Sequence, residues 1–297
     1  METWKDRAIA DSAEPKAADW IPAVNRRDFV ALSVVTGFAL AAQPVAAETM
    51  IVTDTAGLVA GEVSIPASDR SIPGYRAMPA GAGPFPTVLV VEEIFGVHEH
   101  IKDMCRRFAK LGFLAVAPEL YSRLGDVTKI ADIQEVLKVV NQAPDALTVS
   151  DLDATAAWAA KNGGDGRRLG ITGWCRGGRT TWLYAIKNHS GLKAAVAWYG
   201  PLAGNHSDAM PKTILEMVDD LKTPVLGLYG GQDAGIPLAQ VEDMRAALKA
   251  KGKVGELVVY PDAPHGFNAD YRPTYRPEAA KDGMKRLLAW FKQHGAM

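Results

Sequence analysis

The sequence has few cysteines, no basic tract and no internal repeat, and each absence excludes a class of protein. Two cysteines among 297 residues are too few for a disulfide framework. The 33 basic and 34 acidic residues give a formal net charge of −1, without the basic cluster that condenses on nucleic acid. Neither a repeat nor a low-complexity tract is visible. We therefore expect a compact enzyme or binding protein that has no nucleic-acid partner.

The two cysteines have different surroundings. Cys105 lies in the segment IKDMCRRFAKL, Ile101–Leu111, whose apolar residues recur at helical spacing, so it is expected on the buried face of a helix. Cys175 stands among glycines in G-W-C-R-G-G. A bridge between the two cysteines is the alternative. It would require Cα atoms within about 7 Å, which a residue on a helix face does not readily provide.

The first 47 residues have the layout of an export signal. Arg26 and Arg27 precede Phe29–Ala42, which is 14 residues without charge and too short to span a bilayer. Small residues follow, and Ala47 is a plausible last residue before a cleavage site. The arginine pair resembles a twin-arginine signal, so we expect a periplasmic or secreted protein. A helix of the folded domain and an uncleaved membrane anchor are the alternatives.

About 250 residues remain, 48–297, which is a comfortable length for one domain. Short alternating segments at Met50–Pro79 predict antiparallel edge strands. Apolar runs of the buried-strand type then alternate with segments of helical period. The runs are Thr87–Val91, Phe113–Ala117, Leu169–Thr172, Ala194–Trp198, Pro224–Tyr229 and Leu257–Tyr260. The helical segments are His100–Leu111, Ile130–Asn141, Ser150–Lys161, Gly177–Asn188, Leu238–Lys249 and Pro277–Gln293. This pattern predicts an α/β fold: a mostly parallel, twisted sheet with helices on both faces.

Chemically active residues follow several of the predicted strands. Glu92 and Glu93 follow the first apolar run, Cys175 follows the third, Asp233 the fifth and His265 the sixth. The carboxyl ends of parallel strands share one edge of the sheet, where sites of such folds gather. The sequence thus predicts that a thiol, a carboxylate and an imidazole converge there.

The motif around Cys175 has the form of a nucleophile elbow, G-x-S-x-G, with cysteine in place of serine. Gly173 and Gly177 leave room where a sharp strand-to-helix turn presses against neighbouring segments. The positive end of the following helix favours a thiolate. We therefore expect Cys175 to attack an acyl carbon, His265 to transfer protons and Asp233 to orient the imidazole. Backbone N–H groups of Ile94 and Arg176 would form an oxyanion hole.

Each assignment has a structural alternative. Cys175 could be a buried apolar residue, Asp233 could cap the helix beginning near Pro237, and His265 could be an ordinary loop histidine. The remaining histidines are interpreted as surface or capping residues: His98, His100, His189, His206 and His294. Their spacing suggests no metal site, and no metal or organic cofactor is expected.

Several motifs together resemble the dienelactone hydrolases (carboxymethylenebutenolidases) of the α/β-hydrolase superfamily. They are E-E-I-F-G, G-W-C-R-G-G, G-G-Q-D-A-G-I-P and P-H-G-F, with I-P-G-Y-R-A-M-P-A-G and A-P-E-L-Y in support. The resemblance covers nearly all of residues 48–297. It implies a Cys-His-Asp triad at Cys175, His265 and Asp233. It also implies that Glu93 contacts the resting thiol and releases it when substrate binds. The alternative for Glu93 is a loop carboxylate bound by backbone N–H groups, and Glu92 is the weaker candidate for the role.

The sequence departs from the family pattern where the substrate carboxylate is bound. Members of the family carry an arginine soon after the catalytic histidine, whereas here the nearest are Arg272 and Arg276. The best-known members of the family carry another arginine in the segment after the L-Y motif. Here the corresponding segment, 128–141, offers only Lys129 and Lys138. Trp174, Trp198 and Tyr199 are candidates for a pocket wall, with a role in the core as the alternative.

The sequence therefore predicts a hydrolase that opens a lactone or cleaves a small carboxylic ester through a cysteine acyl-enzyme. A broader carboxylesterase or thioesterase on the same fold is one alternative, and a non-catalytic binding protein is another. The expected partner is a small ester or lactone. We expect a monomer whose mature chain has no stable membrane insertion.

Overall fold

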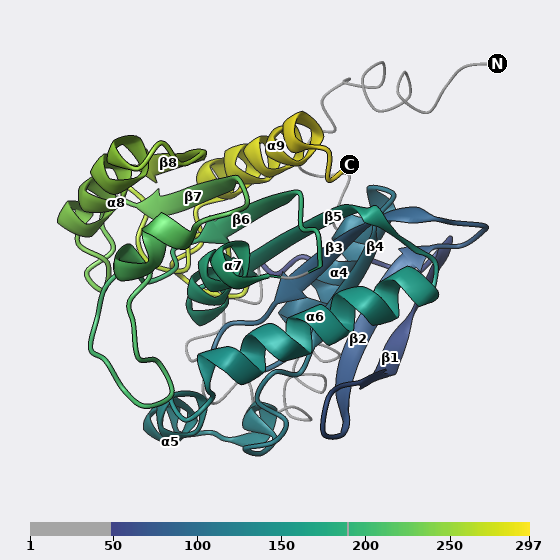
Figure 1. Ribbon diagram of the computed structural model, residues 1–297. Coiled ribbons are helices and arrows are strands. Elements are labelled where there is room, and N and C mark those ends of the chain that lie inside the picture. The colour runs from purple at the N-terminus through teal and green to yellow at the C-terminus, as the bar shows by residue number, and fades with distance from the viewer. Residues whose placement is uncertain (1–48, 189) are drawn as a thin grey trace.

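The computed structural model describes residues 49–188 and 190–297, so the export signal predicted at 1–47 lies outside the described residues, as does His189. The described chain folds around one eight-stranded sheet in the order β1-β2-β4-β3-β5-β6-β7-β8 (Figure 1). The strands are β1 Leu58–Pro66, β2 Ser71–Pro79, β3 Phe85–Val91, β4 Leu114–Pro118, β5 Gly164–Trp174, β6 Ala194–Trp198, β7 Val225–Gly230 and β8 Gly255–Tyr260.

Helices alternate with the strands from β3 onward. They are α4 Glu99–Lys110, α5 Ile133–Val140, α6 Asp145–Lys161, α7 Arg176–Lys187, α8 Leu238–Ala250 and α9 Pro277–His294. Short 3-10 turns lie at Val127–Lys129 and Leu215–Asp220. Among the described residues, no helix is long and apolar enough to cross a membrane.

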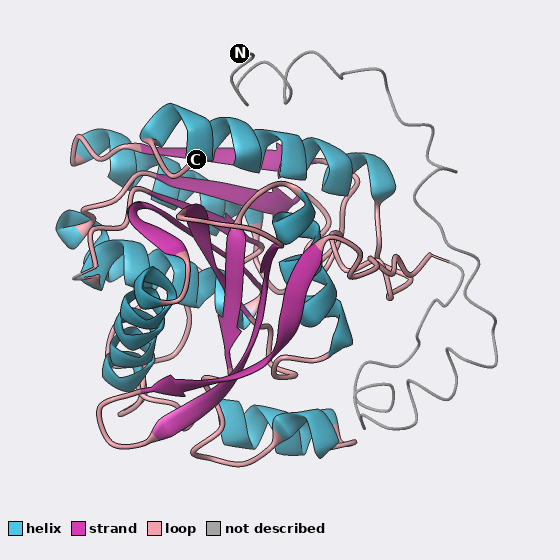
Figure 2. Cartoon of the chain, turned by 90° about the vertical axis from the view of Figure 1, so that its right-hand side faces the viewer, coloured by secondary structure: helices cyan, strands magenta, loops and turns pink. Residues whose placement is uncertain are grey.

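The predicted mixture of strand directions is confirmed. β1 pairs with β2 and β2 with β4 in antiparallel register, whereas every pairing from β4 through β3 to β8 is parallel. Helices flank the sheet on both sides (Figure 2). The architecture is that of an α/β hydrolase, and it directs the carboxyl ends of β3, β5, β7 and β8 toward one edge.

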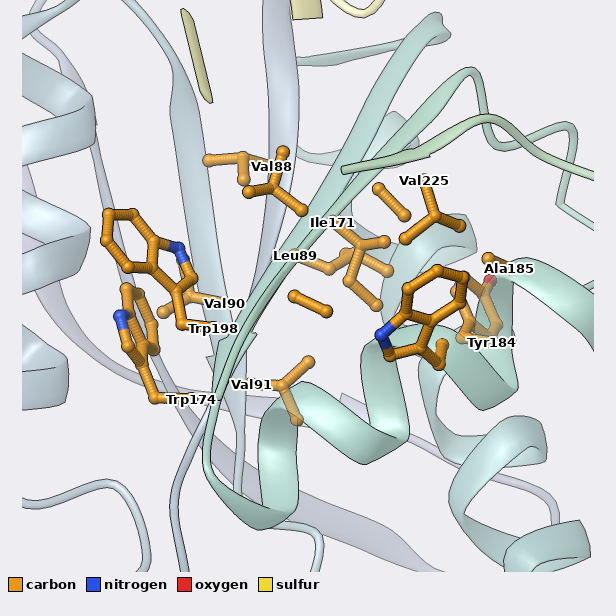
Figure 3. Close-up of a cluster of buried hydrophobic side chains, with 14 of the residues drawn as sticks. Val88, Leu89, Val90, Val91, Ile171, Trp174, Tyr184, Ala185, Trp198 and Val225 are labelled. Carbon is orange, nitrogen blue, oxygen red and sulfur yellow. The ribbon is translucent and has the colours of Figure 1, made fainter. Parts of the chain in front are cut away.

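The core lies on both faces of the central strands. Val88 and Val90 of β3 point to the side where Trp198 lies, whereas Leu89 points with Ile171 toward Tyr184 of α7 (Figure 3). All of these side chains are buried. This alternation follows from the period of two in a strand, and a strand that is buried on both faces must be apolar throughout.

Two elements, β5 and α6, begin five residues earlier than the sequence predicts. β5 starts at Gly164 because Gly164 and Asp165 pair with Phe85 and Pro86 before a register shift, although these residues are not apolar. α6 starts at Asp145, five residues before the expected Ser150. In both cases pairing or packing partners extend the element beyond the segment that has the periodic pattern.

The two cysteines are free thiols, which contradicts the alternative of a bridge between them. Cys105 is fully buried on α4, as its helical spacing predicts. Burial raises the pKa of the Cys105 thiol far above its ordinary value. Cys105 is therefore an inert core residue, whereas Cys175 is only partly buried.

Candidate active site

Cys175 occupies the predicted sharp turn between β5 and α7. Its φ is 54° and its ψ is −119°, a conformation that a side chain disfavours and that is kept only where the surroundings enforce it. Two backbone hydrogen bonds do so: the Cys175 N–H donates to Trp198 O at 3.0 Å, and the Arg179 N–H donates to Cys175 O at 3.1 Å. An ordinary buried cysteine needs no such turn, and Cys175 is only partly buried.

The glycines of the elbow are needed for close approach. A Cβ on Gly177 would lie 2.3 Å from Glu92 O and 2.5 Å from Val91 O. A Cβ on Gly173 would lie 2.5 Å from Gly177 O. The elbow is therefore pressed directly against the end of β3, which brings the loop carrying Ile94 beside the start of α7.

Asp233 and His265 meet across the ends of β7 and β8. The His265 Nδ1–H donates to Asp233 Oδ2 at 2.7 Å. The other carboxylate oxygen, Oδ1, accepts from the N–H groups of Gly235 and Ile236 at 2.9 and 3.2 Å. Asp233 does not cap α8, whose N-cap is Pro237. The two backbone donors fix a buried carboxylate so that its free oxygen orients the imidazole.

His265 connects this carboxylate with the thiol. Burial would lower the pKa of His265, but the hydrogen bond to Asp233 and the neighbouring Cys175 thiol raise it to about 10. The ring of Tyr199 contacts the imidazole edge-on, with ring centroids 4.9 Å apart. The structure thus brings His265 and Asp233 into contact, with Cys175 near enough to act on the imidazole.

Glu93 is buried in a polar cluster next to these residues. Its Oε2 accepts a hydrogen bond from the Tyr271 hydroxyl at 2.7 Å, and His98 Nε2 lies 3.8 Å from the same oxygen. The Arg272 guanidinium lies 4.0 Å from Glu93 Oε2. Burial would raise the pKa of Glu93, but Arg272 and His98 hold it well below its usual range. The Tyr271 side chain, rather than a backbone N–H group, donates this hydrogen bond to the carboxylate.

The interpretation of His98 and His100 as surface or capping residues is wrong. Both are buried, their rings are stacked with centroids 6.1 Å apart, and both contact the Tyr271 ring. His98 stands at the N-cap of α4 without a side-chain capping bond. Burial lowers the pKa of His98 to about 4, so the ring is neutral at neutral pH.

The structure separates the two candidate arginines. Arg272 is largely buried and lies over the rings of Phe95 and Tyr271, 4.9 and 5.2 Å from their centroids. Cys175 and Tyr199 lie near enough for their charges to act on the Arg272 guanidinium. Arg276 donates instead to the carbonyls of Pro273 and Tyr275 in its own loop, and is not brought to the thiol.

The aromatic candidates divide between core and site. Trp198 is fully buried and donates to Thr172 Oγ1 at 3.1 Å, which makes it a core residue. Trp174 stacks on it, with centroids 6.3 Å apart, and its Nε1 has no partner among the described residues (Figure 3). The Tyr199 hydroxyl also lacks a partner within residues 49–188 and 190–297. Of the three, Tyr199 is the one that touches the imidazole.

Sequence reasoning missed Tyr271, which binds Glu93 and packs on both buried histidines. Its only signal is that it lies six residues after His265, in a segment with no apolar period. The loop brings it back toward β3 through turns such as Ala269 N–H to Gly266 O and Arg272 N–H to Ala269 O. Those turns are set by tertiary contacts, which no local pattern shows.

Comparison with known proteins decides the family. A model of the dienelactone hydrolase family matches residues 72–295, which is three quarters of the chain and includes all of the site residues described in this section. The chain belongs to the dienelactone hydrolase family. It is accordingly a hydrolase with the α/β-hydrolase fold, as the motif resemblance implies.

The sequences of related proteins match this member of the dienelactone hydrolase family along most of its length. A protein of Methylorubrum extorquens, provisionally named a carboxymethylenebutenolidase, is 60% identical over 92% of this chain and 94% of its own. One of Escherichia coli K12 with the same provisional name is 54% identical over 88% of this chain and 96% of its own. A crystal structure from Klebsiella pneumoniae, provisionally named a dienelactone hydrolase, is 56% identical, with a TM-score of 0.77 over 80% of this chain and 99% of its own.

Proposed function

We propose that this hydrolase opens a lactone or cleaves a small carboxylic ester through a thioester on Cys175. The observation that carries the proposal is the position of His265, which bonds Asp233 through Nδ1 and interacts with the Cys175 thiol. A ring held in this way can keep a proton beside the sulfur and return it to a leaving group.

The proposed steps follow from that geometry. The sulfur of Cys175 attacks the acyl carbon, and the carbonyl oxygen becomes an oxyanion that the N–H groups of Ile94 and Arg176 would hold. Each such donor typically lowers the barrier by about 3 kcal/mol. His265 protonates the departing alkoxide and leaves the acyl group on sulfur as a thioester. Water then attacks the thioester while His265 takes its proton, which releases the acid and restores the thiol.

Arg272 supports a substrate that carries a carboxylate. Its guanidinium is held over two aromatic rings near the thiol, and its Nε has no hydrogen-bond partner among the described residues. A buried cation with a free donor favours an anionic group on the substrate. We therefore favour a carboxylate-bearing lactone over a neutral ester, and the broader carboxylesterase or thioesterase is the alternative that kinetics must separate.

The experiment compares turnover of a dienelactone with that of short p-nitrophenyl esters by the wild type, Cys175→Ala and Cys175→Ser. The expected result is a higher kcat/KM for the dienelactone in the wild type and loss of both activities in Cys175→Ala. Higher kcat/KM for the neutral esters would favour the broader esterase. Unchanged turnover by Cys175→Ala would contradict the proposal and favour a protein whose Cys-His-Asp set does no chemistry.

We also propose export through a twin-arginine signal at residues 1–47. The support is the sequence pattern alone, with Arg26 and Arg27 before an uncharged stretch. Fractionation of cells that express the full chain tests it. We expect the mature protein in the periplasm, and an Arg26→Lys, Arg27→Lys variant retained inside. Equal retention of both proteins would contradict the proposal.

A further inference from the structure

Two buried carboxyl groups join the loops that follow β3 and β4. The Leu120 N–H donates to Glu92 Oε1 at 2.9 Å, and the Val97 N–H donates to Glu119 Oε1 at 2.8 Å. Each loop therefore supplies an acid that accepts a hydrogen bond from a backbone N–H group of the other loop. β3 and β4 are adjacent parallel strands, so these crossed bonds tie their carboxyl ends together.

The loop held by these bonds is the one that carries Ile94. Gly96 has a φ of +73°, and a Cβ there would lie 3.1 Å from Glu119 Oε2. The backbone thus passes directly over the second acid. On the other side, the carbonyl of Glu92 is one of the two oxygens against which Gly177 of the elbow packs. Glu92 and Glu119 consequently lie between the loop that carries Ile94 and the turn that carries Cys175.

Charge supports a protonated Glu92. Its side chain is fully buried, and burial together with neighbouring Glu119 raises the pKa of Glu92 well above its usual value. Burial raises the pKa of Glu119 to about 7. Two neighbouring buried carboxyl groups cannot both ionise cheaply, so burial and the adjacent Glu119 favour the neutral form of Glu92. A glutamine at this position would keep the acceptor oxygen and the neutral charge.

We propose that Glu92 is a positioning residue for the acyl-transfer reaction, which with Glu119 holds the Ile94 N–H in line with the oxyanion formed at Cys175. The inference rests on the proposed function. Glu92 does not contact the reacting atoms in this account. It acts through the loop, because its carboxyl accepts the N–H of Leu120 while its own backbone lies against the elbow.

The test compares Glu92→Leu with Glu92→Gln on p-nitrophenyl acetate. Glu92→Leu removes the acceptor, and we expect kcat to fall about tenfold or more, since a lost oxyanion donor costs 10²–10³-fold and a displaced one costs less. KM should change much less than kcat. Glu92→Gln keeps the acceptor, so we expect its kcat to stay within about twofold of the wild type.

The rate at which iodoacetamide alkylates Cys175 distinguishes a displaced oxyanion donor from general damage to the site, because general damage would lower this rate as well. This reaction needs the thiol and imidazole but forms no oxyanion, so its rate should be nearly equal in the wild type and both variants. The inference would be overturned by an unchanged kcat in Glu92→Leu, or by an equal loss of kcat in Glu92→Gln. It would also be overturned if the rate of alkylation fell in step with kcat. Failure of the proposed function is distinguishable, because Cys175→Ala would then keep its turnover.

Glu119→Met is the second variant if Glu92→Leu does not fold. It removes the acceptor of the Val97 N–H from the other side of the pair. The same pattern is expected, namely a lower kcat with an unchanged rate of alkylation. A folded Glu119→Met with wild-type kcat would overturn the inference.

Discussion

At the scale of the residue, the site depends on how His265 is held. Asp233 binds the ring through one oxygen and is itself fixed by two backbone N–H groups. An imidazole with this partner has one defined tautomer, and the nitrogen that remains is the one that can serve the thiol.

Replacement of Asp233 by asparagine should separate orientation from packing. Asp233→Asn keeps the side-chain volume but removes the charge, so we expect kcat to fall about 100-fold or more. The pKa of His265 should fall from about 10 toward its ordinary 6.5, which an NMR titration of the ring protons measures. A variant that keeps the high pKa would show that Asp233 does not raise it.

The same shift predicts a pH dependence of stability. The folded pKa of His265 is raised above the ordinary value, so the protonated ring stabilises the fold fully below about pH 6.5 and this contribution is lost as pH rises through about 10. The unfolding midpoint of the wild type should therefore decline over that range, and the decline should be smaller in Asp233→Asn. Parallel curves for the two proteins would contradict the assignment.

Arg272 and Arg276 provide a matched pair for substrate recognition. Arg272 is buried next to Glu93, within range of the charge of Cys175, whereas Arg276 binds its own loop. Arg272→Gln should raise KM for a carboxylate-bearing lactone about tenfold or more, because a charged hydrogen bond is lost, while KM for p-nitrophenyl acetate changes little. Arg276→Gln should change neither value. Equal effects on the charged and neutral substrates would rule out a role for Arg272 in binding the carboxylate.

At the scale of the element, the elbow requires backbone packing that only glycine permits. Gly177→Ala places a Cβ within 2.5 Å of two carbonyl oxygens at the end of β3, so α7 or the loop must shift. We expect a loss of about 1–3 kcal/mol in the free energy of unfolding, together with a loss of kcat. Gly61→Ala on β1 is the control, because its Cβ would meet nothing within 4 Å. Denaturant unfolding measures both variants, and equal stability of the two would contradict this packing account.

The sequence predicts these elements well where one local pattern decides them. The apolar runs locate the strands of the parallel sheet, and G-x-C-x-G locates the turn after β5. The pattern fails at Gly164 and Asp165, whose strand conformation depends on pairing with β3. It fails again at His98, His100 and Tyr271, which meet only because the loop after β8 folds back over α4. Burial by distant segments has no signature in local spacing.

At the scale of the whole molecule, the start of the described chain is fastened to the loop beside the site. Thr49 Oγ1 donates to Asp270 O at 2.5 Å, and the Ile51 N–H donates to Asp270 Oδ1 at 3.4 Å. Arg107 of α4 bonds Asp270 Oδ2 at 2.6 Å. Asp270 is fully buried at the junction of these three segments, and Arg272 follows it by two residues.

At acid pH, protonation of Asp270 should weaken the contacts between these three segments. Burial would raise the pKa of Asp270, but Arg107 and His100 lower it from 3.8 to about 2. The ionised carboxylate therefore stabilises the fold above about pH 3.8 and loses that contribution, roughly 2 kcal/mol, as pH falls toward 2. We expect acid unfolding to be less steep in Asp270→Asn. Asp220→Asn, which alters an exposed pair with Lys187, is the control and should leave the acid limb unchanged.

The most direct test of the central claim is the mass of the protein trapped during turnover. Rapid acid quenching of the wild type during turnover of p-nitrophenyl acetate should show one acetyl group, on the peptide that contains Cys175. An acetyl group on another residue, or full turnover with no covalent adduct and an unmodified Cys175, would contradict the account.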